Sequence, residues 1–200
     1  MRKFTVAPLS QRHEVGQRRR RLAMWLAVAA ALVLAAAVEL SARSSPAELA
    51  ALDDPTIIAI FDAANTADIE TGLLAAERGQ SKEVQAFGAM LARDHQQVRQ
   101  IGRDLAAKLG VTPTPPKDDA GAKAHAQAMA SLRARSGADF DRAFLQHEAA
   151  FHKSVLDAVE STLLPAIRND ELRALVVKVA PAFQGHMVAA QSLEKQLTSK

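Results

Sequence analysis

The chain has 200 residues, of which 48% are hydrophobic and 24% charged, and this balance excludes a disordered protein. Aromatic residues make up only 4%, whereas alanine and leucine dominate, which favours helices over strands. Because the chain has no cysteine, disulfides, zinc–thiolate sites, iron–sulfur clusters and cysteine nucleophiles are excluded. The composition therefore predicts an all-α protein.

The formal net charge of +3 is unevenly distributed along the chain. Residues 1–21 contain the run Arg18–Arg21 and carry a charge of +6, whereas residues 22–200 carry −3. The high isoelectric point therefore belongs to the N-terminal tail. A body without excess positive charge is not typical of a nucleic-acid-binding protein, and we expect no nucleic-acid partner.

An apolar run without a charged residue, 22–38, follows the basic head directly. This order is typical of a signal peptide or of a membrane anchor, and Ala35–Ala37 offers a small-residue cleavage pattern. Both interpretations stay open because 17 residues are at the short end for a membrane-spanning helix. Residues 1–43 thus predict export, to the periplasm or to the inner membrane facing the periplasm, with membrane attachment through 22–38 if the segment is uncleaved.

The remaining chain is predicted to hold a linker, 44–53, and one helical domain, 54–200. Capping residues and glycine stops indicate where its helices begin and end. The first helix starts at Asp54-Pro55 and stops before Gly79, and Ser81 caps the second. A short alanine-rich helix lies in the connection after the second long helix, at 119–135. The four long helices are expected at 54–78, 81–109, 139–167 and 171–196.

The lengths of the connections predict how the helices are arranged. The first two are joined by about two residues and must be antiparallel neighbours, whereas the long crossover lets the second and third run parallel, as in a ferritin-like four-helix bundle. An up-down-up-down bundle is the alternative. Pro181 is expected to kink the fourth helix. Four glycines are expected to allow close helix packing: Gly72, Gly88, Gly102 and Gly185.

Acids and imidazoles interrupt the apolar face of every long helix. One such residue in each long helix lies 11 to 15 residues from an end of that helix: Asp68, His95, His152 and His186. At a rise of about 1.5 Å per residue, these distances place all four near the middle of the bundle. The candidate residues are Asp68 and Glu70 on the first helix, Asp94 and His95 on the second, Glu148 and His152 on the third, and His186 on the fourth.

Buried carboxylates and imidazoles must pair with each other or bind a metal ion, because an unpaired charge in an apolar interior is too costly. Bundle cores often build metal sites from facing helices, and this mixture of ligands suits iron, manganese, zinc or copper. The alternative is two purely structural acid–histidine pairs, such as Asp68 with His95 and Glu148 with His186. His147 lies on the shoulder of the third helix and is expected to stay outside the set.

Three segments, 67–95, 136–152 and 179–193, resemble the exported family of the domain of unknown function numbered 4142. The resemblance rests on four motifs: Asp68, Asp94-His95, Phe140-Asp141 with His152, and Pro181 with His186. It implies a ferritin-like fold, export, and an association with the membrane or outer membrane. Where that family usually has glutamate, this chain has Asp68.

Two hypotheses for the function follow. The first is a cell-envelope protein that binds a transition metal, for metal homeostasis or stress protection. The second is a membrane-tethered structural or interaction module, with an envelope protein or a second copy as its partner. Ala92 and Phe183 stand three residues before His95 and His186, so the Glu-x-x-His pairs of di-iron proteins are missing and we do not expect an oxygen-activating di-iron centre.

Overall fold

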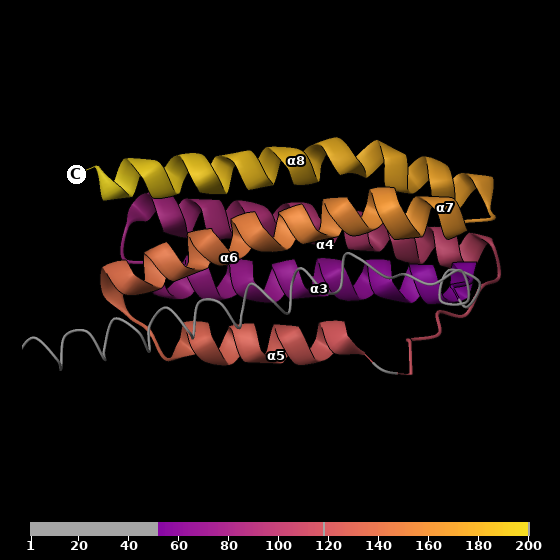
Figure 1. Cartoon of the computed structure of the whole chain (residues 1–200), viewed down its shortest axis with the longest axis horizontal. Helices are drawn as coiled ribbons and strands as arrows, with labels where there is room; N and C mark the ends of the chain where they lie inside the picture. The colour runs from indigo at the N-terminus through magenta and orange to yellow at the C-terminus, as the bar shows by residue number, and fades with distance from the viewer. Residues whose placement is uncertain (1–51, 118, 200) are drawn as a thin grey trace, which may run out of the picture. The chain divides into compact units, whose positions relative to one another are not determined.

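The computed structural model describes residues 52–117 and 119–199, and these residues form helices joined by loops (Figure 1). The described part of the chain contains no strand, so the prediction of an all-α protein is confirmed. The predicted export segment, 1–43, lies outside the described residues. No helix of the described part combines the length and the apolar character that a membrane span requires.

Helices α3 (Asp54–Arg78) and α4 (Lys82–Lys108) form an antiparallel hairpin. Helix α3 has the predicted bounds. Its N-cap is Asp53, not Asp54 as the Asp54-Pro55 pair indicated, and the Asp53 carboxylate accepts the N–H of Thr56 at 2.9 Å. The predicted cap of α4 is confirmed, because the Ser81 hydroxyl oxygen accepts the N–H of Val84 at 3.1 Å. Beyond α4, Gly110 has a φ of +65°, a backbone conformation that favours glycine.

The second half of the chain contains α5 (Ala120–Arg133), α6 (Gly137–Ala158), α7 (Leu164–Ala166) and α8 (Asp170–Thr198). The third long helix was predicted to run to about residue 167, and helical backbone does continue without a break to Ala166, but part of it is not α-helical. A π-helical segment, Val159–Leu163, follows α6, with the N–H of Leu164 donated to the carbonyl of Val159. Pro165 explains the wider turn, since proline has no N–H and its ring excludes the carbonyl four residues earlier.

Helices α4 and α6 run in the same direction (Figure 1). Both begin at one end of the bundle, where the Asp141 carboxylate accepts the N–H groups of Gln80 and Ser81, each at 2.8 Å. At the other end, Lys108 pairs with Glu171, at the beginning of α8. The up-down-up-down alternative is therefore wrong for the described helices. The crossover carries α5 back along the bundle, where it packs on α3 and α6.

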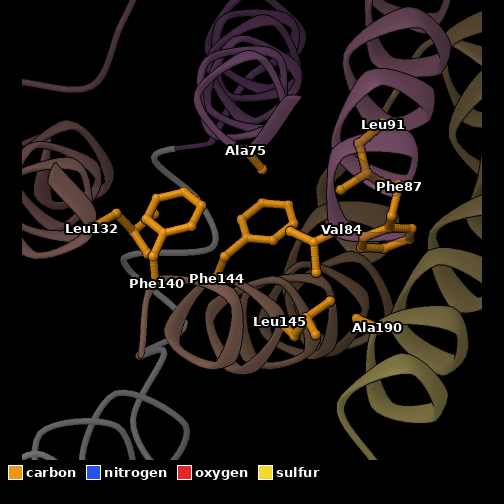
Figure 2. Close-up of a cluster of buried hydrophobic side chains, with 9 residues drawn as sticks. All are labelled: Ala75, Val84, Phe87, Leu91, Leu132, Phe140, Phe144, Leu145 and Ala190. Carbon is orange, nitrogen blue, oxygen red and sulfur yellow. The ribbon is translucent and has the colours of Figure 1, made fainter. Parts of the chain in front are cut away.

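Two apolar clusters fill the bundle on either side of its middle. Figure 2 shows the first, in which two phenylalanines of α6 lie beside residues of α3 and α4. Its buried members are Ala75, Val84, Phe87, Leu91, Leu132, Phe140, Phe144, Leu145 and Ala190. The second is formed by Ile57, Ile58, Ala106, Ile167, Leu172 and Val176. Along each long helix the polar candidates fall between these two clusters, so they form a layer within the core.

Three of the four glycines allow close packing, as predicted. A Cβ atom at Gly72 would lie 2.7 Å from the carbonyl oxygen of Gly88, and one at Gly102 would lie 2.7 Å from the ring of Phe61. Gly185 differs, because a Cβ atom there would meet no other atom within 4 Å. The packing prediction is therefore wrong at Gly185.

Candidate metal centre

The polar layer brings together side chains from all four long helices. Each of its members is at most 9% exposed. Their burial follows from helical periodicity, since each shares a face of its helix with residues of the two apolar clusters. The five residues are Asp68 of α3, His95 of α4, Glu148 and His152 of α6, and His186 of α8.

The ring of His95 is oriented by Asn65, a fully buried residue of α3. The side-chain amide of Asn65 donates to the carbonyl of Phe61 at 2.8 Å, and its oxygen lies 3.0 Å from Nδ1 of His95. This amide oxygen can only accept a hydrogen bond, so the proton of the neutral imidazole is on Nδ1. The lone pair of His95 is therefore on Nε2, which faces the interior of the layer.

His152 is oriented in the same manner by its own helix. Its Nδ1 lies 2.9 Å from the backbone carbonyl oxygen of Glu148, an acceptor, and therefore carries the proton. Its Nε2 is buried and has no hydrogen-bond partner in the described structure. An imidazole nitrogen left without a partner in the core is costly unless something else binds it.

His186 is oriented by a carboxylate at the edge of the bundle. Its Nε2 lies 3.4 Å from Oδ2 of Asp94, whose Oδ1 accepts a hydrogen bond from Arg93 at 2.9 Å. The carboxylate places the proton on Nε2, which leaves the lone pair of His186 on Nδ1.

Two of these imidazoles meet directly, with Nε2 of His95 3.2 Å from Nδ1 of His186. A proton on Nδ1 of His186 would make this contact a hydrogen bond, whereas a proton on Nε2, facing Asp94, leaves two unprotonated nitrogens that repel. Burial, followed by repulsion from His152 and His186, lowers the pKa of His95 to about 3, so His95 is a neutral imidazole near neutral pH. Two nitrogens bound to one metal ion at about 2.0–2.1 Å lie about 3 Å apart, which is the spacing found here.

The other half of the layer is a pair of buried carboxyl groups. No oxygen of Asp68 or Glu148 has a hydrogen-bond partner among the described residues. Burial, followed by the charge of Glu148, raises the pKa of Asp68 well above its ordinary value, and burial raises the pKa of Glu148 to about 7. Oδ2 of Asp68 is 3.4 Å from Nδ1 of His95, so the carboxyl pair adjoins the imidazoles directly.

Two sets of three ligand atoms are close enough to hold an ion. The first consists of His95, His152 and His186, and the second of Asp68, Glu148 and His152. Within each set all ligand atoms lie within 4.8 Å of one another. His152 belongs to both sets, but through different edges of its ring. Its Nδ1, which carries the proton, lies 3.6 Å from Oε2 of Glu148 and 3.9 Å from Oδ1 of Asp68, whereas its lone pair is on Nε2.

The family model described as Domain of unknown function (DUF4142) matches residues 39–193. The chain belongs to this family. The matched range includes every residue of the candidate centre. A search among curated proteins and a search among solved structures each found no match. The chemistry of this DUF4142 chain therefore has to be argued from the geometry of its centre.

Two of the candidates predicted from the sequence lie outside the two ligand sets. Glu70 is half exposed, and its carboxylate pairs with Nε2 of His125 on α5 at 2.8 Å. Asp94 lies behind His186 and orients it. The physical reason is the helical wheel: Glu70 is two residues from Asp68, about 200° around the helix, and so cannot share its face. His147 also lies outside both sets and stacks on Phe151 with ring centroids 5.8 Å apart.

Two residues outside the predicted set support the centre of this DUF4142 chain: Asn65, which the sequence did not single out, and Phe183, which was placed on the fourth helix without this role. Asn65 orients His95, and Phe183 packs edge-on against its ring with centroids 4.9 Å apart. Both carry a signal in their spacing, because Asn65 is three residues before Asp68 and Phe183 is three before His186. Residues three apart lie on the same face of a helix, so an amide at this spacing is a candidate for a supporting partner.

Proposed function

We propose that this chain is a ferritin-like bundle of the cell envelope that binds a divalent transition-metal ion in its core. The observation that carries the proposal is the arrangement of His95, His152 and His186. Each imidazole has one nitrogen occupied by an orienting acceptor and presents the other, without its proton, to the same interior volume. Such outer hydrogen bonds are typical of histidines that bind metals.

A purely structural role for the layer is less well supported. A buried polar network that only fixes the packing of the helices satisfies its own hydrogen bonds, since each unsatisfied group reduces stability. Here Nε2 of His152 and all four oxygens of Asp68 and Glu148 have no hydrogen-bond partner within the described structure. The acid–histidine contacts of the structural alternative are present, with Asp68 3.4 Å from His95 and Glu148 3.6 Å from His152, but they leave these atoms without a hydrogen bond. A cation among the three imidazoles would bind the free Nε2 of His152.

The ligand types indicate which ions suit the centre. Neutral imidazoles suit zinc, copper, iron and nickel, whereas carboxylates also suit manganese. A site of three imidazoles beside two carboxyl groups therefore fits iron, manganese, zinc or copper, as the sequence alone predicted. When bound, the ion would supply positive charge and Lewis acidity within the core.

Location and fold complete the proposal. The parallel course of α4 and α6 and the crossover between them support a ferritin-like bundle. The basic head followed by the apolar run 22–38 supports export, with attachment to the inner membrane if the run is uncleaved. An ion-binding bundle on the periplasmic side suits metal homeostasis or stress protection. The protein could act in this role as a monomer, as a homo-oligomer or with an envelope protein.

The test is elemental analysis of the full chain, purified without a histidine tag. We expect about one equivalent of a transition metal in the wild type and almost none in the double variant His95→Ala/His186→Ala. The matched control is His125→Ala/His147→Ala, which removes two histidines outside the ligand sets and should keep its metal. The proposal fails if metal-free wild type has the same melting temperature with and without each of the four metals.

A further inference from the structure

The glycine next to His186 has no steric reason to be glycine. The helical glycines Gly72, Gly88 and Gly102 stand where a Cβ atom would come within 2.6–2.7 Å of another atom. At Gly185, in the interior of α8, a Cβ atom would meet open space. Glycine in a helix interior is less stable than alanine, so α8 is weakened at this point without a gain in packing.

A second residue weakens the same stretch of α8. Pro181 lies inside the helix, four residues before Gly185. Proline has no N–H and its ring clashes with the preceding turn, so the carbonyl of Val177 loses its helical partner. Val177 is 54% exposed and solvent can replace that hydrogen bond. The segment 181–186 therefore combines two residues that weaken a helix, and it ends at a metal-ligand candidate.

The same place is where the centre comes closest to solvent. The side chains of Asp68, His95, Glu148 and His152 are at most 1% exposed. The side chain of His186 is 11% exposed, and that of its partner Asp94 is 32% exposed. Accessibility thus increases in one direction, from the interior through His186 to Asp94 between α4 and α8.

The opposite side of the bundle is covered. Helix α5 packs on α3 and α6, and its Met129 and Leu132 are buried. The ion pair between Glu70 of α3 and His125 of α5 closes this side near the level of Asp68. Among the described residues, the centre is therefore closest to solvent on the side of α4 and α8.

We propose that the metal ion enters and leaves the centre between α4 and α8, through a local opening of segment 181–186 that moves His186. Asp94 is the carboxylate that meets the incoming ion first and then orients His186 on it. This inference rests on the proposed metal site and specifies its use. A centre with a built-in opening serves reversible binding of the ion, as in buffering or transfer, whereas a permanently structural ion needs none.

The experiment compares rates of Co²⁺ release from the full-length protein. Co²⁺ is loaded, its absorption spectrum is recorded, and release to excess EDTA is followed by stopped flow. Gly185→Ala should slow release about five-fold, the rate equivalent of the helix-propensity difference between glycine and alanine, with the spectrum unchanged. Pro181→Ala should slow release further. Gly121→Ala, a glycine-to-alanine change in α5, is the matched control and should release Co²⁺ at the wild-type rate.

The Co²⁺ release rates test the proposed opening separately from the proposed metal site. If the wild type binds Co²⁺ but Gly185→Ala and Pro181→Ala release it at the wild-type rate, the opening is wrong and the site stands. If Gly121→Ala slows release equally, general stabilisation explains the effect and the opening is again wrong. A wild type that binds no Co²⁺ overturns the site and the opening together.

A measurement that needs no metal tests the opening independently. Hydrogen exchange of backbone amides in the metal-free protein should be faster in residues 181–189 of α8 than in residues 91–99 of α4, which hold His95 at the corresponding level. Gly185→Ala should reduce this difference. Equal protection of the two stretches would overturn the proposed opening.

Discussion

Asn65 and His95 form a fixed donor–acceptor pair across α3 and α4, with Nδ1 of His95 3.0 Å from the Asn65 side-chain oxygen. The Asn65 amide cannot rotate without losing its 2.8 Å hydrogen bond to the carbonyl of Phe61. The pair therefore sets both the tautomer and the direction of the His95 ring. Asn65 would therefore prepare His95 for a metal ion without contacting the ion itself.

Replacing Asn65 by alanine should weaken metal binding without removing a ligand. The loss of an outer hydrogen-bond partner lowers metal affinity by about 10–100-fold, because the ring is no longer held in its tautomer and direction. Co²⁺ titration against a competing chelator measures the change. Gln96→Ala, an exposed substitution next to His95, is the control and should keep wild-type affinity. An Asn65→Ala variant with unchanged affinity would contradict the role assigned to Asn65.

Replacing Glu148 by glutamine should change stability and metal affinity in opposite directions. Glu148 is fully buried beside Asp68, so above its pKa of about 7 it places an uncompensated charge in the core. Removing that charge should stabilise the metal-free protein at pH 8 by about 1–3 kcal/mol. The same change removes an anionic ligand and should reduce the affinity for Co²⁺. Urea unfolding and Co²⁺ titration of one preparation test both signs, and equal signs would contradict the argument.

Metal binding should release protons near neutral pH. The raised pKa values of Asp68 and Glu148 mean that the metal-free centre still holds protons on its carboxyl groups at pH 6. An incoming cation must displace them, so about one proton or more should leave per ion at pH 6, and affinity should rise through pH 7. Calorimetry at pH 6 in two buffers with different ionisation enthalpies measures this number. Binding heats that do not depend on the buffer would contradict it.

Helical periodicity was sufficient to predict which polar side chains lie in the core. His95 and His186 fall within apolar stripes and His152 at the edge of one, and the structure buries all three close together. Glu70 shows the limit of this reasoning. Glu70 lies on a shoulder of α3, so the helical wheel does not show which residue it contacts. The packing of α5 places His125 2.8 Å from it and makes this histidine its partner.

Two features of the fold depend on long-range packing and could not be predicted. The crossover length was compatible with either course of the third long helix, and contacts such as Asp141 with the Ser81 N–H are visible only in the folded chain. The π-helical segment Val159–Leu163 had a local signal in Pro165, but a proline in the last turns of a helix is compatible with several local conformations.

The metal-free protein should lose stability as the pH falls below neutral. Burial lowers the pKa of His95 to about 3 and that of His152 to about 4. Below about pH 6.5 these histidines therefore bind protons in the unfolded chain but stay neutral in the folded chain. Each of them reduces the free energy of unfolding by about 1.4 kcal/mol per pH unit in this range. The raised carboxyl pKa values act in the opposite direction, between about 4.5 and 7, and offset part of the loss.

The histidines outnumber the carboxyl groups, because the pKa values of His147 and His186 are lowered by burial as well. The net expectation is a maximum of stability near neutral pH and a clear decrease by pH 5. Urea unfolding of the metal-free protein at pH 7 and pH 5 measures it, with His125→Ala as a control that keeps the same decrease. A midpoint that does not change between the two pH values would contradict the burial of these rings as neutral groups.

Substituting alanine at Gly72 and at Gly185 should affect stability with opposite signs. At Gly72 the new Cβ atom would lie 2.7 Å from the carbonyl oxygen of Gly88, so α3 and α4 must separate, at a cost of about 1–3 kcal/mol. At Gly185 the Cβ atom meets nothing, and the gain in helix propensity should stabilise α8 by up to about 1 kcal/mol. The midpoint of urea unfolding gives both signs in one assay. Asp68 is one turn from Gly72, so the separation of the helices should also move Asp68 away from His95. Gly72→Ala should therefore bind Co²⁺ more weakly than the wild type. Gly185→Ala should bind it as tightly as the wild type or more tightly.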